Sequence, residues 1–154
     1  MANMRRKDRQ TSELDAWKVV EMCQYAVISM IAEDGSPYCV PVNIVRDGNR
    51  IYFHSATAGK KAIALRMNPR VCINCVTNAE VVQSSYTTLF DSATLFGTVQ
   101  EVEDTEERLE AMRKICLHHA PDHMERFEAS IARSFTNTAI WRVTVESITG
   151  KRNR

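Results

Sequence analysis

YAVISMIAEDGSPYCVPVNIVRDGNRIYFHSA, residues Tyr25 to Ala56, contains three apolar runs separated by two turn signals. The turn signals are Glu33–Ser36 and Asp47–Asn49, and each contains an Asp-Gly pair. Such pairs are typical of tight turns between antiparallel strands. The stretch therefore predicts three strands joined by two hairpins. Pro41 lies inside the second strand and has no N–H to donate, which predicts an edge, a bulge or an unpaired stretch there.

On both sides of this stretch, the sequence contains further patterns that are typical of strands and helices. Helix-forming stretches predict four helices; Ser12 is the expected N-cap of the first, and the third is expected to start at a cap near Asp104 or Thr105. Runs rich in β-branched and aromatic residues predict three more strands, and Gly97 marks a bend in the longest. Six strands with local hairpins indicate an α+β protein, mainly β, built on an antiparallel sheet or small barrel. The expected helices are Glu13–Cys23, Gly59–Asn68, Asp104–Ala120 and Pro121–Phe135, and the further strands are Arg70–Val76, Tyr86–Glu103 and Thr138–Lys151.

Composition limits the classes of protein that are compatible with this chain. Its 154 residues suit a single domain, residues 1–154. Twenty basic and 19 acidic residues give a net charge of +1, so no overall field attracts nucleic acid or a membrane surface. The first ten residues, MANMRRKDRQ, lack the apolar core of a secretory signal and are interpreted as a flexible basic arm. Five cysteines without a disulfide-framework spacing suit a reducing cytoplasm, which is the predicted location.

Two patterns look like metal sites, but no metal ligand is predicted from either. In CINC, Cys72 and Cys75 are three apart on an expected strand, so they point to opposite faces, and no second C-x-x-C completes four ligands. We interpret this pair as structural. The run HHAPDH has no carboxylate-x-x-histidine pattern, and imidazolium groups suit a helix C-terminus. We interpret its histidines, His118, His119 and His123, as a solvated helix cap.

The end of the third strand has the chemistry of a phosphate site. The helix that follows offers unpaired N–H groups and partial positive charge at its N-terminus. Gly59 allows close approach of a ligand to the backbone, and Lys60 and Lys61 add two ammonium groups. Ser55 and Thr57 supply hydroxyl groups just before them. The alternative is an ordinary surface helix that carries two lysines.

These motifs together resemble a known superfamily. DGSPYCVPVNIVRDGNRIYFHSATAGKK, NPRV, YTTLFDSATLFG and ITGK follow one another in the order found in the FMN-binding split-barrel superfamily of pyridoxamine 5′-phosphate oxidase. The resemblance is nearest to its nitroimidazole-resistance (Nim-type) branch. It implies a six-stranded antiparallel split barrel with peripheral helices. It also implies a homodimer that holds two FMN molecules at the subunit interface.

The resemblance also implies the residues of the cofactor site. His54 would be the catalytic residue and contact flavin or substrate, or it would only hydrogen-bond the phosphate or a neighbouring backbone group. Val40 and Val45 stand where the vitamin-synthesis oxidases have an arginine and a lysine, and their C-terminal tryptophan-and-arginine segment is absent. These departures argue against pyridoxamine phosphate as substrate. The implied phosphate contacts are His54, Ser55, Lys60 and Lys61, and the ring contacts are Val40, Pro41, Val42, Asn43, Ile44 and Ser92.

The function that follows is an FMN-dependent oxidoreductase. It would pass electrons from a reduced small-molecule donor through the flavin to a small organic acceptor, with a nitroaromatic compound as one candidate. One alternative is a non-catalytic flavin-binding protein that senses redox state. A second is a haem or deazaflavin binder on the same barrel, with His54 as a ligand of the iron.

Overall fold

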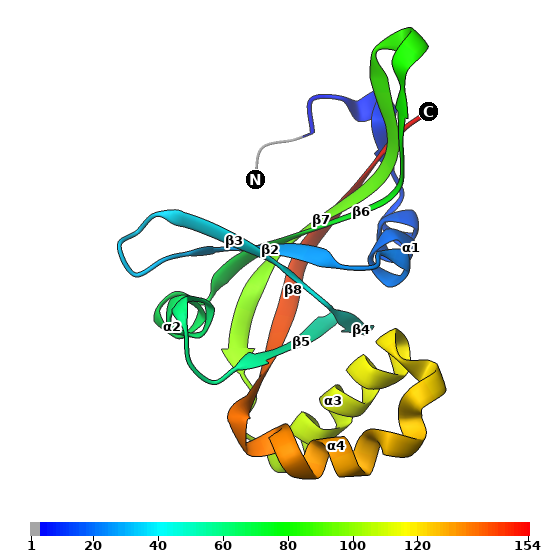
Figure 1. Ribbon diagram of the computed structural model, residues 1–154. Coiled ribbons are helices and arrows are strands. Elements are labelled where there is room, and N and C mark those ends of the chain that lie inside the picture. Colours follow the sequence, from blue (N-terminus) through cyan, green and yellow to red (C-terminus); the bar gives the residue numbers. More distant parts are fainter. Residues whose placement is uncertain (1–3) are drawn as a thin grey trace.

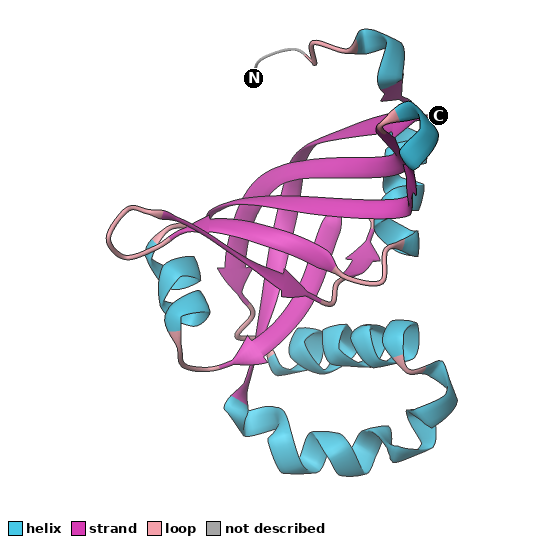
Figure 2. Cartoon of the chain, turned by 45° about the horizontal axis from the view of Figure 1, so that its top comes forward, coloured by secondary structure: helices cyan, strands magenta, loops and turns pink. Residues whose placement is uncertain are grey.

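The computed structural model describes residues 4–154 and shows one antiparallel sheet that curls on itself, with helices at its periphery (Figures 1 and 2). The order of its strands is β3-β2-β6-β7-β8-β5-β4, and β1 pairs with β8. The two ends of the sheet, β3 and β4, are therefore consecutive in the chain. The strands are β1 Gln10–Thr11, β2 Ala26–Ile31, β3 Pro37–Val42, β4 Val45–Asp47, β5 Arg50–Ala56, β6 Arg70–Val82, β7 Thr87–Glu101 and β8 Thr138–Asn153.

This architecture confirms the predicted class, an α+β, mainly β protein on an antiparallel split barrel with peripheral helices. All six predicted strands are present, and β1 and β4 are additional short strands. β4 is separate because Asn43 and Ile44 belong to no strand and interrupt the predicted second strand. Both predicted hairpins form, with Ile31 opposite Pro37 and Asp47 opposite Arg50.

The first and third helices begin where their capping residues predict. The Ser12 hydroxyl accepts a hydrogen bond from the Asp15 N–H at 3.1 Å, and an Asp104 carboxylate oxygen accepts one from the Glu107 N–H at 2.9 Å. The predicted helix from Pro121 onward starts instead as a 3-10 segment, because His123 has a non-helical φ of −123°. The helices are α1 Glu13–Met22, α2 Lys60–Met67, α3 Thr105–His119 and α4 Phe127–Ser134, and the 3-10 segments are η1 Lys7–Arg9, η2 Gln83–Ser85, η3 Pro121–Arg126 and η4 Phe135–Asn137.

The N-terminal arm, residues 1–10, lies partly outside the described residues. Of its described part, Lys7–Arg9 form η1 and Gln10 begins β1, opposite Lys151 of β8. No helix in residues 4–154 combines the length and apolar character needed to span a membrane.

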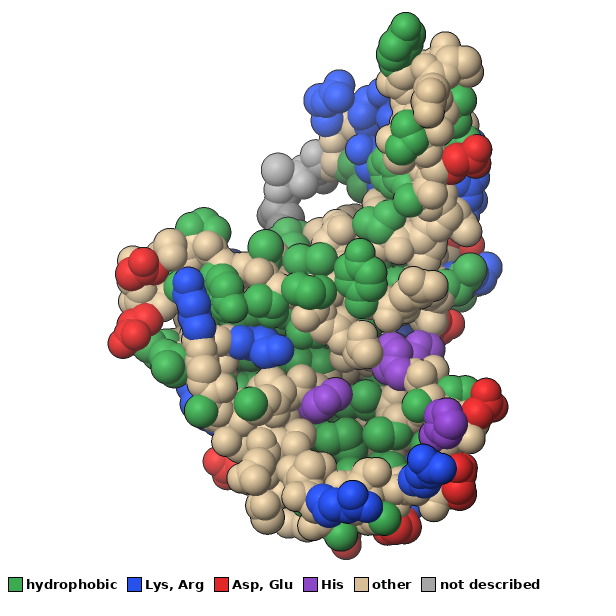
Figure 3. Space-filling view, in the orientation of Figure 1, with side chains coloured by type: hydrophobic (Ala, Val, Ile, Leu, Met, Phe, Trp, Pro, Cys, Tyr) green, Lys and Arg blue, Asp and Glu red, His purple; other side chains and the backbone are tan. Residues whose placement is uncertain are grey.

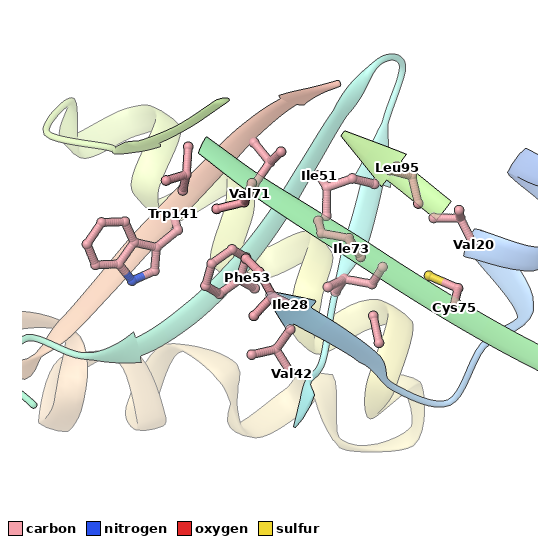
Figure 4. Close-up of a cluster of buried hydrophobic side chains, with 14 of the residues drawn as sticks. Val20, Ile28, Val42, Ile51, Phe53, Val71, Ile73, Cys75, Leu95 and Trp141 are labelled. Carbon is pink, nitrogen blue, oxygen red and sulfur yellow. The ribbon is translucent and has the colours of Figure 1, made fainter. Parts of the chain in front are cut away.

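Two apolar cores lie on opposite faces of β5 and β8. The inner core fills the barrel and is closed by α1; in it the rings of Phe53 and Trp141 stack with centroids 6.4 Å apart (Figure 4). The outer core joins Tyr52 and Ile140 to α3 and α4. Strand alternation explains this division, because neighbouring residues of a strand point to opposite faces. The α3–α4 pair is thereby fixed against the outside of the barrel.

Gly97 lies at the bend predicted in the long strand. The register between β7 and β8 shifts between Phe96 and Gly97, and a Cβ atom at Gly97 would lie 2.2 Å from the carbonyl oxygen of Thr144. Only glycine allows the two strands to approach so closely there.

Candidate functional site

A pocket of about 640 Å³ opens where β3 ends, and we call it the Lys61 pocket. Its volume lies within the range of small-molecule sites. Five of its lining residues are among those predicted from the sequence, and Tyr25 is additional. The lining residues are Tyr25, Pro41, Val42, Asn43, His54 and Lys61.

One wall of the Lys61 pocket is formed by a strand edge with free backbone groups. β3 is an edge strand, since within residues 4–154 it pairs with β2 alone. Pro41 of β3 lies opposite Val27 of β2. The side chains of Val42 and Ile44 are buried in the inner core, and Val40 packs against it. Because β3 is an edge strand, its backbone N–H and C=O groups that point away from β2 have no strand partner among residues 4–154, and such groups are suited to the polar edge of a heterocycle.

The N-terminus of α2 forms a second wall. Gly59 caps the helix with a φ of +105°, a conformation that L side chains rarely adopt. A Cβ atom built at Gly59 would meet nothing within 4 Å, so backbone conformation and not crowding is what requires glycine. The first N–H groups of the helix have no partner within it and carry the positive end of its dipole.

The two adjacent lysines point into different places. Lys61 lines the pocket, whereas the Nζ atom of Lys60 lies 4.4 Å from the centroid of the Tyr38 ring. Lys60 also borders a separate hollow of about 540 Å³ beside the acidic turn at Glu33 and Asp34. Successive helical residues are turned by about 100°, which explains the divergence. Of the two lysines predicted to contact the phosphate, the structure brings only Lys61 to the pocket.

Lys61 is a half-buried cation without an acidic partner among the described residues. Burial lowers the pKa of its ammonium group, because removal from water disfavours the charged form. A bound anion would reverse that penalty. The pocket is accordingly suited to a negatively charged group at its α2 end.

His54 projects from β5 into the same pocket. Its side chain is exposed toward the pocket, but protein atoms crowd its other side, and this desolvation is the main cause that lowers the pKa of His54. The charges of Lys61 and His119 lower it further. The imidazole is therefore largely neutral at pH 7, with one ring nitrogen available as a donor and the other as an acceptor.

Ser55 and Ser92 do not line the Lys61 pocket. The Ser55 hydroxyl is buried, accepts a hydrogen bond from Nε1 of Trp141 at 2.8 Å and donates one to the carbonyl of Ala56 at 2.7 Å. The Ser92 hydroxyl lies on β7 and donates to the carbonyl of Lys151 at 3.5 Å. The Ser55 side chain is thus occupied in the barrel wall, and Ser92 belongs to another part of the sheet.

Sequence reasoning missed two residues at this site. Tyr25 lines the pocket from the residue before β2, where no motif marks it. His119, which we expected to be part of a solvated cap, lies with its Nε2 atom 2.8 Å from the carbonyl oxygen of Ile44. The two residues are 75 positions apart, so no local pattern reveals this contact. Within residues 4–154 no group of three or more metal-ligating side chains converges.

Solved structures with the same fold include proteins with several different cofactors. A protein from Bacteroides thetaiotaomicron assigned to 5-nitroimidazole antibiotic resistance is 26% identical, with a TM-score of 0.78 over 91% of this chain and 83% of its own. A Mycobacterium smegmatis protein that binds FAD and haem is 18% identical, with a TM-score of 0.80 over 95% and 74%. An FAD-binding protein from Mesorhizobium loti is 23% identical, with a TM-score of 0.66 over 95% and 98%. The last two similarities establish the fold alone.

The family is shown by a direct sequence match. No curated protein matches this chain. The sequence model of the family described as pyridoxamine 5′-phosphate oxidase, however, matches residues 12–152 and so covers β2 to β7, nearly all of β8, both apolar cores and the Lys61 pocket. The chain belongs to the pyridoxamine 5′-phosphate oxidase family.

Proposed function

We propose that this protein binds FMN in the Lys61 pocket and passes electrons from a reduced small-molecule donor to a small organic acceptor. One observation carries the proposal: the free edge of β3 and the half-buried, unpaired Lys61 meet in a single pocket whose lining contains no acidic residue. The first feature suits a flat polar ring, and the second suits a phosphate.

The residues present fit such a cofactor at both of its ends. Val40–Ile44 would orient the ring through backbone groups, while Lys61 and the first N–H groups of α2 would hold the phosphate. When bound, FMN would supply the redox chemistry. Neutral His54 lines the same pocket, where its N–H would donate a hydrogen bond and its other ring nitrogen would accept a proton from the ring or a substrate.

A nitroaromatic compound is the acceptor that we favour. The 26% identical structure assigned to 5-nitroimidazole resistance supports this choice. The Val40 and Val45 positions, which lack the basic groups of the vitamin-synthesis oxidases, speak against a phosphorylated pyridoxamine. We place the reaction in the cytoplasm because the five cysteines are free thiols.

We further propose that the working unit is a homodimer. The family resemblance assigns Ser92 to the flavin ring, yet Ser92 does not line the Lys61 pocket of its own chain. A second copy that supplies its β7 residues to this pocket would reconcile the two observations.

The absorbance spectrum of the purified protein, before and after addition of FMN, tests the proposal. We expect the two visible bands of oxidised flavin, and their bleaching when a reduced nicotinamide is added without oxygen. Restored absorbance on addition of a nitroaromatic compound would complete the cycle. Flavin that binds but does not turn over with any donor would favour a sensor, and a Soret band or a deazaflavin spectrum would overturn the choice of FMN.

A further inference from the structure

The backbone that forms the free-edge wall of the Lys61 pocket is held from outside the barrel by α3. Asn43 and Ile44 lie between β3 and β4, outside the ladders of both strands. The Ile44 carbonyl points toward the helical layer, where Nε2 of His119 lies 2.8 Å away. His119 is the last residue of α3, so a helix that contributes no residue to the pocket lining contacts its wall directly.

We infer that His119 is a positioning residue that fixes the Asn43–Ile44 backbone for the flavin ring, an inference that rests on the function proposed above. The carbonyl oxygen only accepts hydrogen bonds, so Nε2 of His119 must carry a hydrogen. A carbonyl held by a ring on a packed helix has a defined direction, and because the peptide unit is planar this direction also fixes the N–H of Val45, directly after the Asn43–Ile44 segment. The Asn43–Ile44 backbone would therefore already have its ring-binding conformation in the flavin-free protein.

Neighbouring contacts also hold the residues that follow Asn43 and Ile44 against two helices. Lys114, also on α3, pairs with Asp47 of β4 at 2.7 Å. Arg46 pairs with Glu21 at 2.6 Å and lies over the Trp17 ring at 4.1 Å, which ties β4 to α1. These contacts hold the β4 side of the break. His119 contacts the interruption between β3 and β4 directly, because it donates a hydrogen bond to the carbonyl of Ile44, which belongs to no strand.

The surroundings of His119 give its ring a fixed orientation. The rings of His118 and His119 meet edge to face with centroids 4.7 Å apart. In Figure 3 the histidine side chains gather where the barrel meets the α3–α4 layer, on the hollowed face of the molecule. The charge of His119 also contributes to lowering the pKa of His54. His119 thus contacts the backbone proposed to bind the ring and acts on the candidate catalytic imidazole only through its charge.

The test compares His119→Leu and His119→Gln with the wild type in titrations with FMN and with riboflavin. Leucine removes the donor, whereas a glutamine amide can place its Nε2 near that of histidine. We expect His119→Leu to weaken both ligands by about tenfold, because the loss concerns the ring and not the phosphate. His119→Gln should recover most of the affinity. His123→Leu, a change of an exposed histidine in η3, is the matched control and should bind as the wild type does.

Two results would overturn the inference: unchanged binding of both ligands by His119→Leu, or binding by His119→Gln as weak as that by His119→Leu. Amide hydrogen exchange across residues 43–47, measured without flavin, separates this failure from that of the proposed function. Faster exchange in His119→Leu and wild-type exchange in His119→Gln are expected. A wild-type protein that binds neither ligand would sink the proposed function, and unchanged exchange in His119→Leu would sink the positioning role on its own.

Discussion

The indole N–H of Trp141 donates a 2.8 Å hydrogen bond to the hydroxyl of Ser55, the residue that follows His54 on β5. Because neighbouring residues of a strand point to opposite faces, Ser55 faces the barrel interior and His54 faces the Lys61 pocket. At the end of β5, Ser55 therefore belongs to the core and the preceding residue, His54, belongs to the candidate site.

Ser55→Ala should reduce stability more than cofactor affinity. The change leaves the buried Trp141 N–H without an acceptor, which costs about 1–3 kcal/mol. Urea unfolding should show this loss, while titration with FMN should give a dissociation constant within about threefold of the wild type. A large loss of FMN affinity in a variant of unchanged stability would show that the Ser55 hydroxyl contacts the phosphate instead.

Lys61→Ala should weaken the binding of FMN by roughly ten- to a hundredfold. Hydrogen bonds to charged groups contribute about 1.5–3 kcal/mol, and each decade of affinity corresponds to about 1.4 kcal/mol. Riboflavin lacks the phosphate and should bind the variant and the wild type almost equally in the same fluorescence titration. If riboflavin affinity falls as far as FMN affinity, Lys61 supports the fold and not the phosphate.

Lys60→Ala is the matched control for this prediction. Lys60 lies over the Tyr38 ring and borders the hollow beside Glu33 and Asp34, away from the Lys61 pocket. We expect its FMN affinity to change by less than about threefold. Equal losses in the two lysine variants would mean that both side chains reach one phosphate.

The pKa of His54 should lie below its ordinary value in the flavin-free protein and rise when FMN binds. Burial, then the charges of Lys61 and His119, disfavour the imidazolium form, whereas a phosphate anion would favour it. A histidine with a lowered pKa makes the folded protein less stable as the pH falls through about 6.5 toward that lower pKa, because the unfolded chain binds the proton more readily. NMR titration of the His54 ring measures both values.

Lys61→Ala checks the cause of this shift. Removal of the nearby ammonium group should raise the pKa of His54 in the flavin-free protein and reduce the further rise on addition of FMN. A His54 pKa that is the same in both proteins would show that Lys61 lies too far from His54 to influence its charge.

The homodimer prediction is tested by sedimentation at several protein concentrations, with and without FMN. We expect a dimer whose dissociation is suppressed by FMN, since the cofactor would contact both subunits. A monomer that retains full FMN affinity would exclude a site shared between two chains.

Local sequence determined the elements of this protein. The Asp-Gly turns predict both hairpins of Tyr25–Ala56, and Ser12 and Asp104 predict the starts of α1 and α3, because turns and caps depend on residues only a few positions apart. Gly97 also marks the bend of β7 in the sequence, although the close approach that requires glycine is to Thr144 of β8 and depends on strand pairing. The motifs of the family are likewise continuous stretches, so they are recognised without coordinates.

Tertiary structure decided how those elements form a site. The break at Asn43–Ile44 arises because β3 pairs with β2 and β4 with β5, on opposite ends of the curled sheet. Lys61 faces the pocket and Lys60 does not because helix packing fixes the rotation of α2. The contact of His119 with Ile44 joins residues 75 positions apart. Such contacts depend on how the whole sheet curves and where α3 packs on it, and this global packing is not encoded in any single stretch of sequence.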